Sequence, residues 1–357
     1  MRPMSHRRRT VSVLTLLPLL VVALLTGPAS PAQAATTHCT QHSLNVRTSD
    51  PGPVNAVLWG ELCYRGVRQP RTVQLLVHGA GYNHSYFDIG HGGGFYSYVK
   101  AANAVGYATF NVDRIGAGNS SHPASPLVNI NSGSVALHDA ITALRSGAVS
   151  GTGFSKVIWV GHSYGSIYGW SEIARYHDVD AFINTAALHL FNQPHLDTNL
   201  FPNFYAAASD PALAGLGLDP GYLTSRPNTR GLLYYHPSTV TAGALAADEA
   251  NKDAVTYTQM LDLAAIVALP PAQALTQQIT VPTLILNGQQ DPMHCGPAAM
   301  DCGSTSAVHA FESQYYSPQA RIKTVLIPGT GHNTVLSTTA PLSAAIMLGW
   351  AFTVAAP

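Results

Sequence analysis

Lys156-Val157-Ile158-Trp159-Val160-Gly161-His162-Ser163-Tyr164-Gly165 is the stretch from which the fold of this chain can be predicted. Its apolar first half predicts a buried strand, and the G-x-S-x-G pattern predicts a sharp turn into a helix with an exposed serine. Glycines fit this turn, since a β-carbon at Gly161 or Gly165 would collide with the adjoining strand or helix. Ser163 is therefore a candidate nucleophile. A glycine- and serine-rich loop without a catalytic role is the alternative for so short a pattern.

Two later segments supply the partners that a nucleophilic serine needs. A base must remove the hydroxyl proton, and a carboxylate must orient the base. Residues 282–288 predict a buried strand followed by Asp291, and residues 322–329 predict another followed by His332. Because the carboxyl ends of parallel strands meet at one edge of a sheet, we expect Ser163, Asp291 and His332 to lie together.

Two further motifs precede this set. Asp113-Arg114-Ile115-Gly116-Ala117-Gly118-Asn119-Ser120 is similar to a D-x-R-G-x-G-x-S loop with its arginine one place early, and His78-Gly79 ends an apolar strand. In this order the motifs resemble those of the α/β-hydrolase superfamily, in particular its secreted esterases and lipases, over residues 43–355. The resemblance implies an α/β fold, a doubly wound, mostly parallel sheet with an inserted, mainly helical cap at about residues 188–275.

The resemblance also implies an oxyanion hole made by the backbone N–H groups of Ala80 and Tyr164. Such donors face the negative charge that develops on the attacked carbonyl oxygen. His91-Gly92-Gly93-Gly94 is an alternative, because one lipase branch uses an HGGG sequence for this purpose. We favour Ala80, since an HGGG motif should end the strand itself. The loop of Asp113 and Arg114 is expected to support the floor of the site.

The remaining pattern alternates strands with helices, which is typical of a parallel sheet covered on both faces. An antiparallel hairpin is expected over residues 43–64. The other predicted strands are 72–78, 107–112, 156–161, 180–186, 282–287 and 321–327, and the predicted helices are 94–105, 133–147, 164–176 and 340–352. Residues 35–357 are thus expected to form one catalytic domain.

Residues 1–34 are typical of a secretory signal peptide. Arg2 and Arg7-Arg8-Arg9 precede an apolar stretch from Val11 to Leu25. Ala32-Gln33-Ala34 fits an A-x-A cleavage site, so a mature chain would begin at Ala35. The apolar stretch is shorter than the roughly 20 residues of a membrane span, and no stable membrane anchoring is expected. The paired arginines leave both the general secretory route and the twin-arginine route open.

Charge excludes one class of partner. Removing residues 1–34 takes away four arginines and no acid, which leaves fourteen basic and eighteen acidic side chains and a net charge of −4. A nucleic-acid partner is therefore not expected, because such proteins carry a basic surface. Charged residues make up 10% of the chain and apolar residues 46%, which favours a globular domain with a large core.

All four cysteines follow the signal peptide, and exported chains form disulfides. Three pairings are possible on paper. We favour Cys39 with Cys63 and Cys295 with Cys302, since the predicted hairpin brings the first two together. The second bridge would clamp the loop of Asp291. A metal site is disfavoured because neither pair has C-x-x-C spacing.

Aromatic residues beside the oxyanion strand are candidates for the substrate pocket. They are Tyr82, His84, Tyr86 and Phe87, with a second set in the expected cap at Tyr205, Tyr222, Tyr234, Tyr235 and His236. Such residues also pack loops without touching a ligand, and that alternative stands for each of them.

Together these features predict a secreted serine hydrolase of carboxylic esters or lactones of small, largely apolar molecules. The reaction would pass through an acyl-enzyme and would need no cofactor and no metal. The same triad serves amidases or peptidases, thioesterases and cofactor-free perhydrolases, and a non-catalytic binding protein is a remote alternative. The sequence leaves the identity of the ester, its acyl length and the oligomeric state open.

Overall fold

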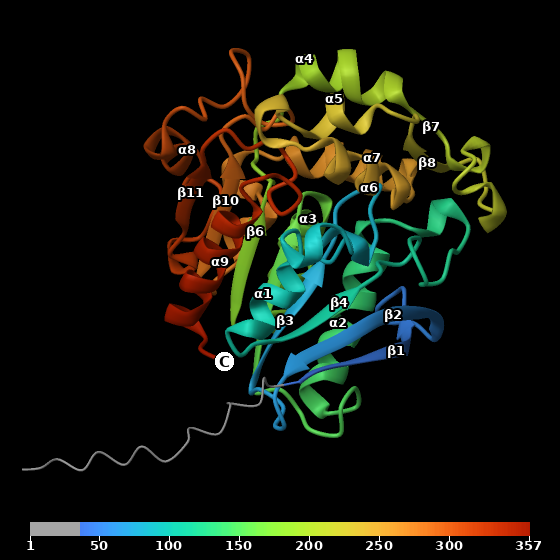
Figure 1. Cartoon of the computed structure of the whole chain (residues 1–357), viewed down its shortest axis with the longest axis vertical. Helices are drawn as coiled ribbons and strands as arrows, with labels where there is room; N and C mark the ends of the chain where they lie inside the picture. The colour runs from blue at the N-terminus through green and yellow to red at the C-terminus, as the bar shows by residue number, and fades with distance from the viewer. Residues whose placement is uncertain (1–35) are drawn as a thin grey trace, which may run out of the picture. The chain divides into compact units, whose positions relative to one another are not determined.

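An eight-stranded sheet runs through residues 36–357, the part of the chain that the computed structural model describes (Figure 1). Its order is β1-β2-β4-β3-β5-β6-β10-β11, and β2 alone runs antiparallel to its neighbours. The strands are β1 (Thr37–Arg47), β2 (Val54–Arg65), β3 (Thr72–Val77), β4 (Ala108–Val112), β5 (Lys156–His162), β6 (Ala181–Thr185), β10 (Thr283–Gly288) and β11 (Lys323–Ile327). The predicted mostly parallel sheet is confirmed, whereas the predicted signal peptide lies outside the described residues.

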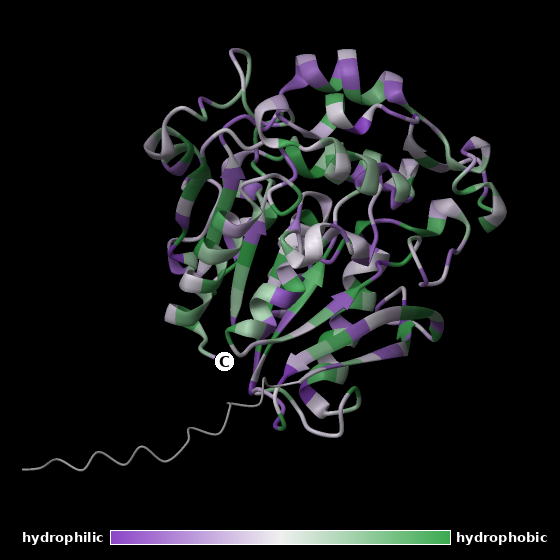
Figure 2. Cartoon of the chain, viewed as in Figure 1, coloured by the Kyte–Doolittle hydropathy of each residue, from purple (hydrophilic) through white to green (hydrophobic). Residues whose placement is uncertain are grey.

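The parallel strands are apolar because helices cover both of their faces. Successive side chains of a strand point to opposite faces, so Leu75 joins the core beneath α2 and α3 while Leu76 joins the core beneath α1 and α9. Figure 2 shows apolar residues along the central strands. The helices are α1 (Tyr98–Ala104), α2 (Ile130–Ser146), α3 (Tyr164–Tyr176), α8 (Thr305–Glu312) and α9 (Ala340–Val354).

The predicted elements agree with these bounds except in three places. The hairpin expected from residue 43 begins earlier, because β1 starts at Thr37. The helix expected from residue 94 begins only at Tyr98, because Gly92–Gly94 forms a separate 3-10 turn with positive φ angles. Ser97 then caps α1, and its side chain accepts a hydrogen bond from the Lys100 N–H. Helix α8 was not predicted; it lies in the crossover between β10 and β11.

The chain between β6 and β10 contains short helices and a second, three-stranded antiparallel sheet. These strands have two to four residues, too few to show an alternating pattern, and the sequence did not predict them. The elements are α4 (Gln193–His195), β7 (Phe204–Ala206), β8 (Tyr222–Ser225), α5 (Arg230–Tyr234), α6 (Ala242–Ala250), β9 (Val255–Thr256) and α7 (Tyr257–Val267). In Figure 1 the helices of this segment lie at the top of the molecule, beyond one end of the large sheet.

Both disulfides have the predicted local pairing, Cys39 with Cys63 and Cys295 with Cys302. Cys39 and Cys63 stand directly opposite each other on β1 and β2. Within residues 36–357, each helix is too short or too polar to cross a membrane.

The packing of α2 on α3 gives a first prediction. A β-carbon at Gly133 would lie 2.2 Å from the buried ring of Tyr168, so Gly133→Ala should destabilise the fold by about 1–3 kcal/mol through overpacking. In a chain of this size that lowers the Tm by roughly 1–2 °C per kcal/mol, measurable by thermal unfolding. Gly349→Ala in α9 is the control, since open space surrounds that position and alanine favours a helix. Equal Tm values for the two variants would contradict the close contact.

Candidate active site

Ser163 occupies a strained turn between β5 and α3. Its φ is 51° and its ψ is −118°, a conformation that non-glycine residues rarely adopt. The neighbouring glycines leave no room for a side chain. A β-carbon at Gly161 would lie 2.5 Å from the Cα of Ser166, and one at Gly165 would lie 2.0 Å from the Val77 carbonyl oxygen. The surrounding backbone therefore holds the serine in this conformation.

His332 and Asp291 form a buried hydrogen-bonded pair. The Nδ1 of His332 lies 3.0 Å from each oxygen of the Asp291 carboxylate. The Asp291 side chain is fully buried and that of His332 is 2% exposed. A proton on Nδ1 is thereby directed at the carboxylate. Nε2 is then the ring nitrogen that is left without a proton. The His332 backbone N–H donates to the Tyr234 carbonyl oxygen at 2.8 Å, which fixes the loop from the opposite side.

The pKa of Asp291 is lowered by this arrangement. Burial alone would raise the pKa, but the charge and hydrogen bond of His332 outweigh the effect of burial, and the Met293 N–H, 2.9 Å from Oδ1, acts in the same direction. Asp291 is thus an ionised hydrogen-bond acceptor, the state that orients an imidazole and stabilises its positive charge.

The end of β3 lies directly beside Ser163. A β-carbon at Gly79 would meet the Cβ of Ser163 at 3.1 Å, and Ala80 follows immediately. Tyr164 is the first residue of α3, so its N–H has no partner within the helix. The buried Arg114 guanidinium donates to the Gly79 carbonyl at 2.8 Å and supports this loop from below. The HGGG alternative lies elsewhere, in an exposed turn.

A very narrow, largely apolar cavity of about 30 Å³ lies beside Ser163. It brings Ser163 and His332 together with both predicted oxyanion residues. Its walls are Ala80, Tyr82, Ser163, Tyr164, Ile167, Ala186, Phe191, Leu200, Phe204, Tyr234, Met260, Leu263, Met293, His294 and His332. A second cavity, of about 430 Å³, lies against α7 and shares a wall with the first, made of Phe191, Leu200, Met260, Leu263 and Met293.

Of the four aromatic residues expected in the pocket, Tyr82 lines this cavity and the other three lie elsewhere. Residues 84–86 form a 3-10 turn that directs them away from it. His84 Nδ1 bonds Asp113 Oδ1 at 2.8 Å, Tyr86 stacks on His162 at 3.9 Å, and Phe87 is in the core. In the second set, Tyr234 lines the cavity and Tyr205, Tyr222, Tyr235 and His236 do not.

A buried ion pair that the sequence did not predict connects the inserted segment to the site. Arg230 donates to Asp248 at 2.9 Å and to the Gly81 carbonyl at 3.2 Å, and its guanidinium lies 4.1 Å from the ring centre of Tyr82. The Tyr82 hydroxyl in turn bonds Asn333, the residue after His332. The loops of Ala80 and His332 are therefore joined through the same cluster.

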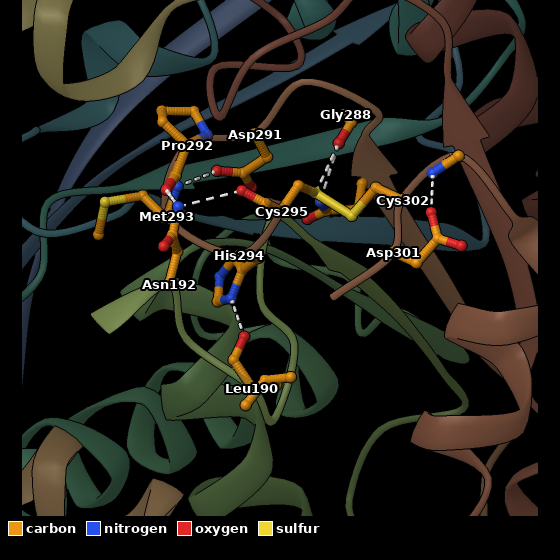
Figure 3. The surroundings of a disulfide bond; sticks show 12 residues. Leu190, Asn192, Gly288, Asp291, Pro292, Met293, His294, Cys295, Asp301 and Cys302 are labelled. Carbon is orange, nitrogen blue, oxygen red and sulfur yellow. Dashed lines mark hydrogen bonds between the residues drawn. A yellow bond between two sulfur atoms is a disulfide. The ribbon is translucent and has the colours of Figure 1, made fainter. Parts of the chain in front are cut away.

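The Cys295–Cys302 disulfide lies just beyond Asp291 (Figure 3). The Cys295 N–H donates to the Asp291 carbonyl at 2.8 Å. Asn192, from the segment after β6, donates to the Pro292 and Cys295 carbonyls at 3.0 and 3.1 Å. The loop that carries Asp291, the acid loop, is thus closed by hydrogen bonds and by a covalent bridge.

Two more histidines surround the pair. His162 is buried with its ring 5.0 Å from that of His332, and burial, together with the neighbouring His332, lowers the pKa of His162. His294 lines the cavity and bonds the Leu190 carbonyl through Nδ1 at 2.9 Å. His294, His332 and Asp291 offer atoms within 4.8 Å of one another, a spacing that could also hold a metal ion.

Comparison with known proteins agrees with the fold. In solved structures, a soluble variant of monoglyceride lipase from Saccharomyces cerevisiae in complex with a substrate analogue is 17% identical, with a TM-score of 0.60 over 90% of this chain and 97% of that one. A thermophilic esterase from Thermogutta terrifontis is 15% identical, with a TM-score of 0.58 over 88% and 99%. No curated protein sequence matches significantly. A sequence profile of the Alpha/beta hydrolase family matches residues 74–345, and the chain belongs to that family.

Proposed function

We propose that this protein is an exported serine hydrolase that cleaves carboxylic esters of small, largely apolar molecules. The observation that carries the proposal is the combination of Ser163 in a strained turn with the His332–Asp291 pair around one apolar cavity. The two disulfides support export to an oxidising compartment, and residues 1–34 would be the signal peptide.

In the proposed reaction, Ser163 Oγ attacks the ester carbonyl carbon while His332 Nε2 takes the hydroxyl proton. The N–H groups of Ala80 and Tyr164 stabilise the oxyanion, and His332 then gives its proton to the leaving alcohol. Water attacks the acyl-enzyme with help from the same base. Asp291 stays ionised throughout and stabilises the imidazolium. The inserted segment, residues 188–275, would act as the cap that supplies the apolar wall over Ser163.

Replacing the proposed nucleophile or base should remove most ester turnover. Ser163→Ala and His332→Ala should each lower kcat for p-nitrophenyl butyrate by about 10⁴-fold or more, and Asp291→Asn by about 10³–10⁴-fold, because the three act as one unit. Circular dichroism should show an unchanged fold. A variant of Ser163 or His332 that keeps more than roughly a tenth of wild-type turnover would contradict the triad.

A fluorophosphonate probe should label Ser163 covalently if the protein is a serine hydrolase. A non-catalytic binding protein would leave Ser163 unlabelled.

Opening the Cys295–Cys302 bridge should affect turnover through Asp291. The double variant Cys295→Ser/Cys302→Ser should lower kcat by about tenfold even below its Tm, because the acid loop loses its constraint. On an Asp291→Ala background the same change should have little further effect, and a double-mutant cycle measures this coupling.

The matched control is Cys39→Ser/Cys63→Ser at the edge of the sheet. From loop entropy, this double variant should lower the free energy of unfolding by about 3.5 kcal/mol, against about 2.5 kcal/mol for loss of the Cys295–Cys302 bridge. The folded variant should keep the wild-type kcat. Equal losses of kcat for the two double variants would contradict the proposal that the Cys295–Cys302 bridge acts through Asp291.

The wall between the two cavities should set the preferred acyl length. Met260 lines both cavities, so Met260→Ala should open one toward the other and raise the ratio of kcat/KM for p-nitrophenyl octanoate over acetate. We expect at least a roughly fourfold rise, the equivalent of burying one more methylene. Leu261→Ala on the same helix is the control, because that side chain is exposed and lines neither cavity. If both variants keep the wild-type ratio, the second cavity does not receive the substrate.

A further inference from the structure

Three titratable side chains meet on the side of the molecule where α2 packs against α3. They are His138 on α2, Glu172 on α3 and Asp178 just after α3. The Nδ1 of His138 lies 2.6 Å from Asp178 Oδ2 and 3.8 Å from Glu172 Oε1. One ligand atom from each residue falls within 4.8 Å of the others. None of the three lines the cavity at Ser163.

The cluster holds more hydrogen-bond acceptors than donors. Glu172 is fully buried, and among the residues that the structure describes neither of its carboxylate oxygens has a hydrogen-bond partner. The Oδ1 atom of Asp178 is also buried and unpartnered. His138 Nδ1 can donate one hydrogen at most. A buried carboxylate without a partner is costly, so the site calls for a positive charge.

The surroundings suit a small cation. The ring of His138 stacks on Tyr176 with centroids 3.8 Å apart and an angle of 8°, which fixes the direction of Nδ1. His138 and Asp178 are 23% and 17% exposed, so one side of the cluster is open to solvent.

We propose that His138, Glu172 and Asp178 form a binding site for a divalent transition-metal ion, with Zn²⁺ as the best match. One imidazole nitrogen and two carboxylates are ligands that Zn²⁺ accepts, with a fourth position left for water. Ca²⁺ and Mg²⁺ prefer oxygen ligands alone. Such an ion would fasten α2 to the far end of α3, the helix that begins after Ser163, and would act on stability, not in the chemical step.

Calorimetric titration of ZnCl₂ into the chelator-treated full chain tests the site. We expect saturable binding and, at about 100 times the Kd, a rise in Tm of roughly 3–5 °C. Glu172→Gln keeps the shape of the side chain but removes its charge, and should weaken binding by more than about a hundredfold. His138→Ala, at a partly exposed position that tolerates truncation, should do the same if Glu172→Gln fails to fold.

Two controls separate this site from other zinc sites. Asp139→Asn changes the acid next to His138 whose carboxylate is already bound by Arg47, and it should keep wild-type affinity. His332→Gln disrupts the other histidine-containing cluster and should also keep the Tm rise. If zinc leaves the Tm of the wild type unchanged, or if Glu172→Gln binds zinc as the wild type does, the proposal is overturned. In that case Glu172 and Asp178 share a proton instead.

Discussion

The close contact between the β5–α3 turn and the end of β3 is the constraint on which the rest of the site depends. At Gly165 the backbone of α3 lies so near the backbone at the end of β3 that no β-carbon fits between them. This close packing keeps Ser163 at its positive φ. The same contact sets Ala80 beside the serine and points the start of α3 at it, where the helix dipole favours negative charge. The proposed nucleophile and the proposed oxyanion donors are thus parts of one rigid unit, and only the proposed base and acid have to be brought to it.

The parts of this site that were predictable are those with a local chemical cause. Glycine spacing around Ser163 determines a turn by itself, and Asp291 and His332 each follow an apolar strand whose end has a known place in a parallel sheet. The Arg230–Asp248 pair has no such signal, because its partner loops lie far away in the sequence. Tyr86 was misplaced for a similar reason, since a single 3-10 turn decides which way its ring points.

The segment between β6 and β10 also makes hydrogen bonds that hold the loops of the site in place. Its Tyr234 carbonyl accepts a hydrogen bond from the backbone N–H of His332, and its Arg230 donates to the Gly81 carbonyl. The loop of the proposed base and the loop of the proposed oxyanion donor are therefore both fixed from one short stretch around α5. Motion of this stretch would therefore shift the proposed base and the oxyanion loop together.

The Cys39–Cys63 bridge has a consequence for assembly of the sheet edge. Strand β1 is largely exposed and offers few buried side chains to specify its alignment with β2. A slip of one residue would move Cys39 by about 3.4 Å and turn it to the other face, so the sulfurs could not join. The Cys39–Cys63 disulfide therefore forms only when β1 and β2 are paired in the observed register. A thiol-reduced one would leave an unlocked edge open to pairing with a neighbouring molecule.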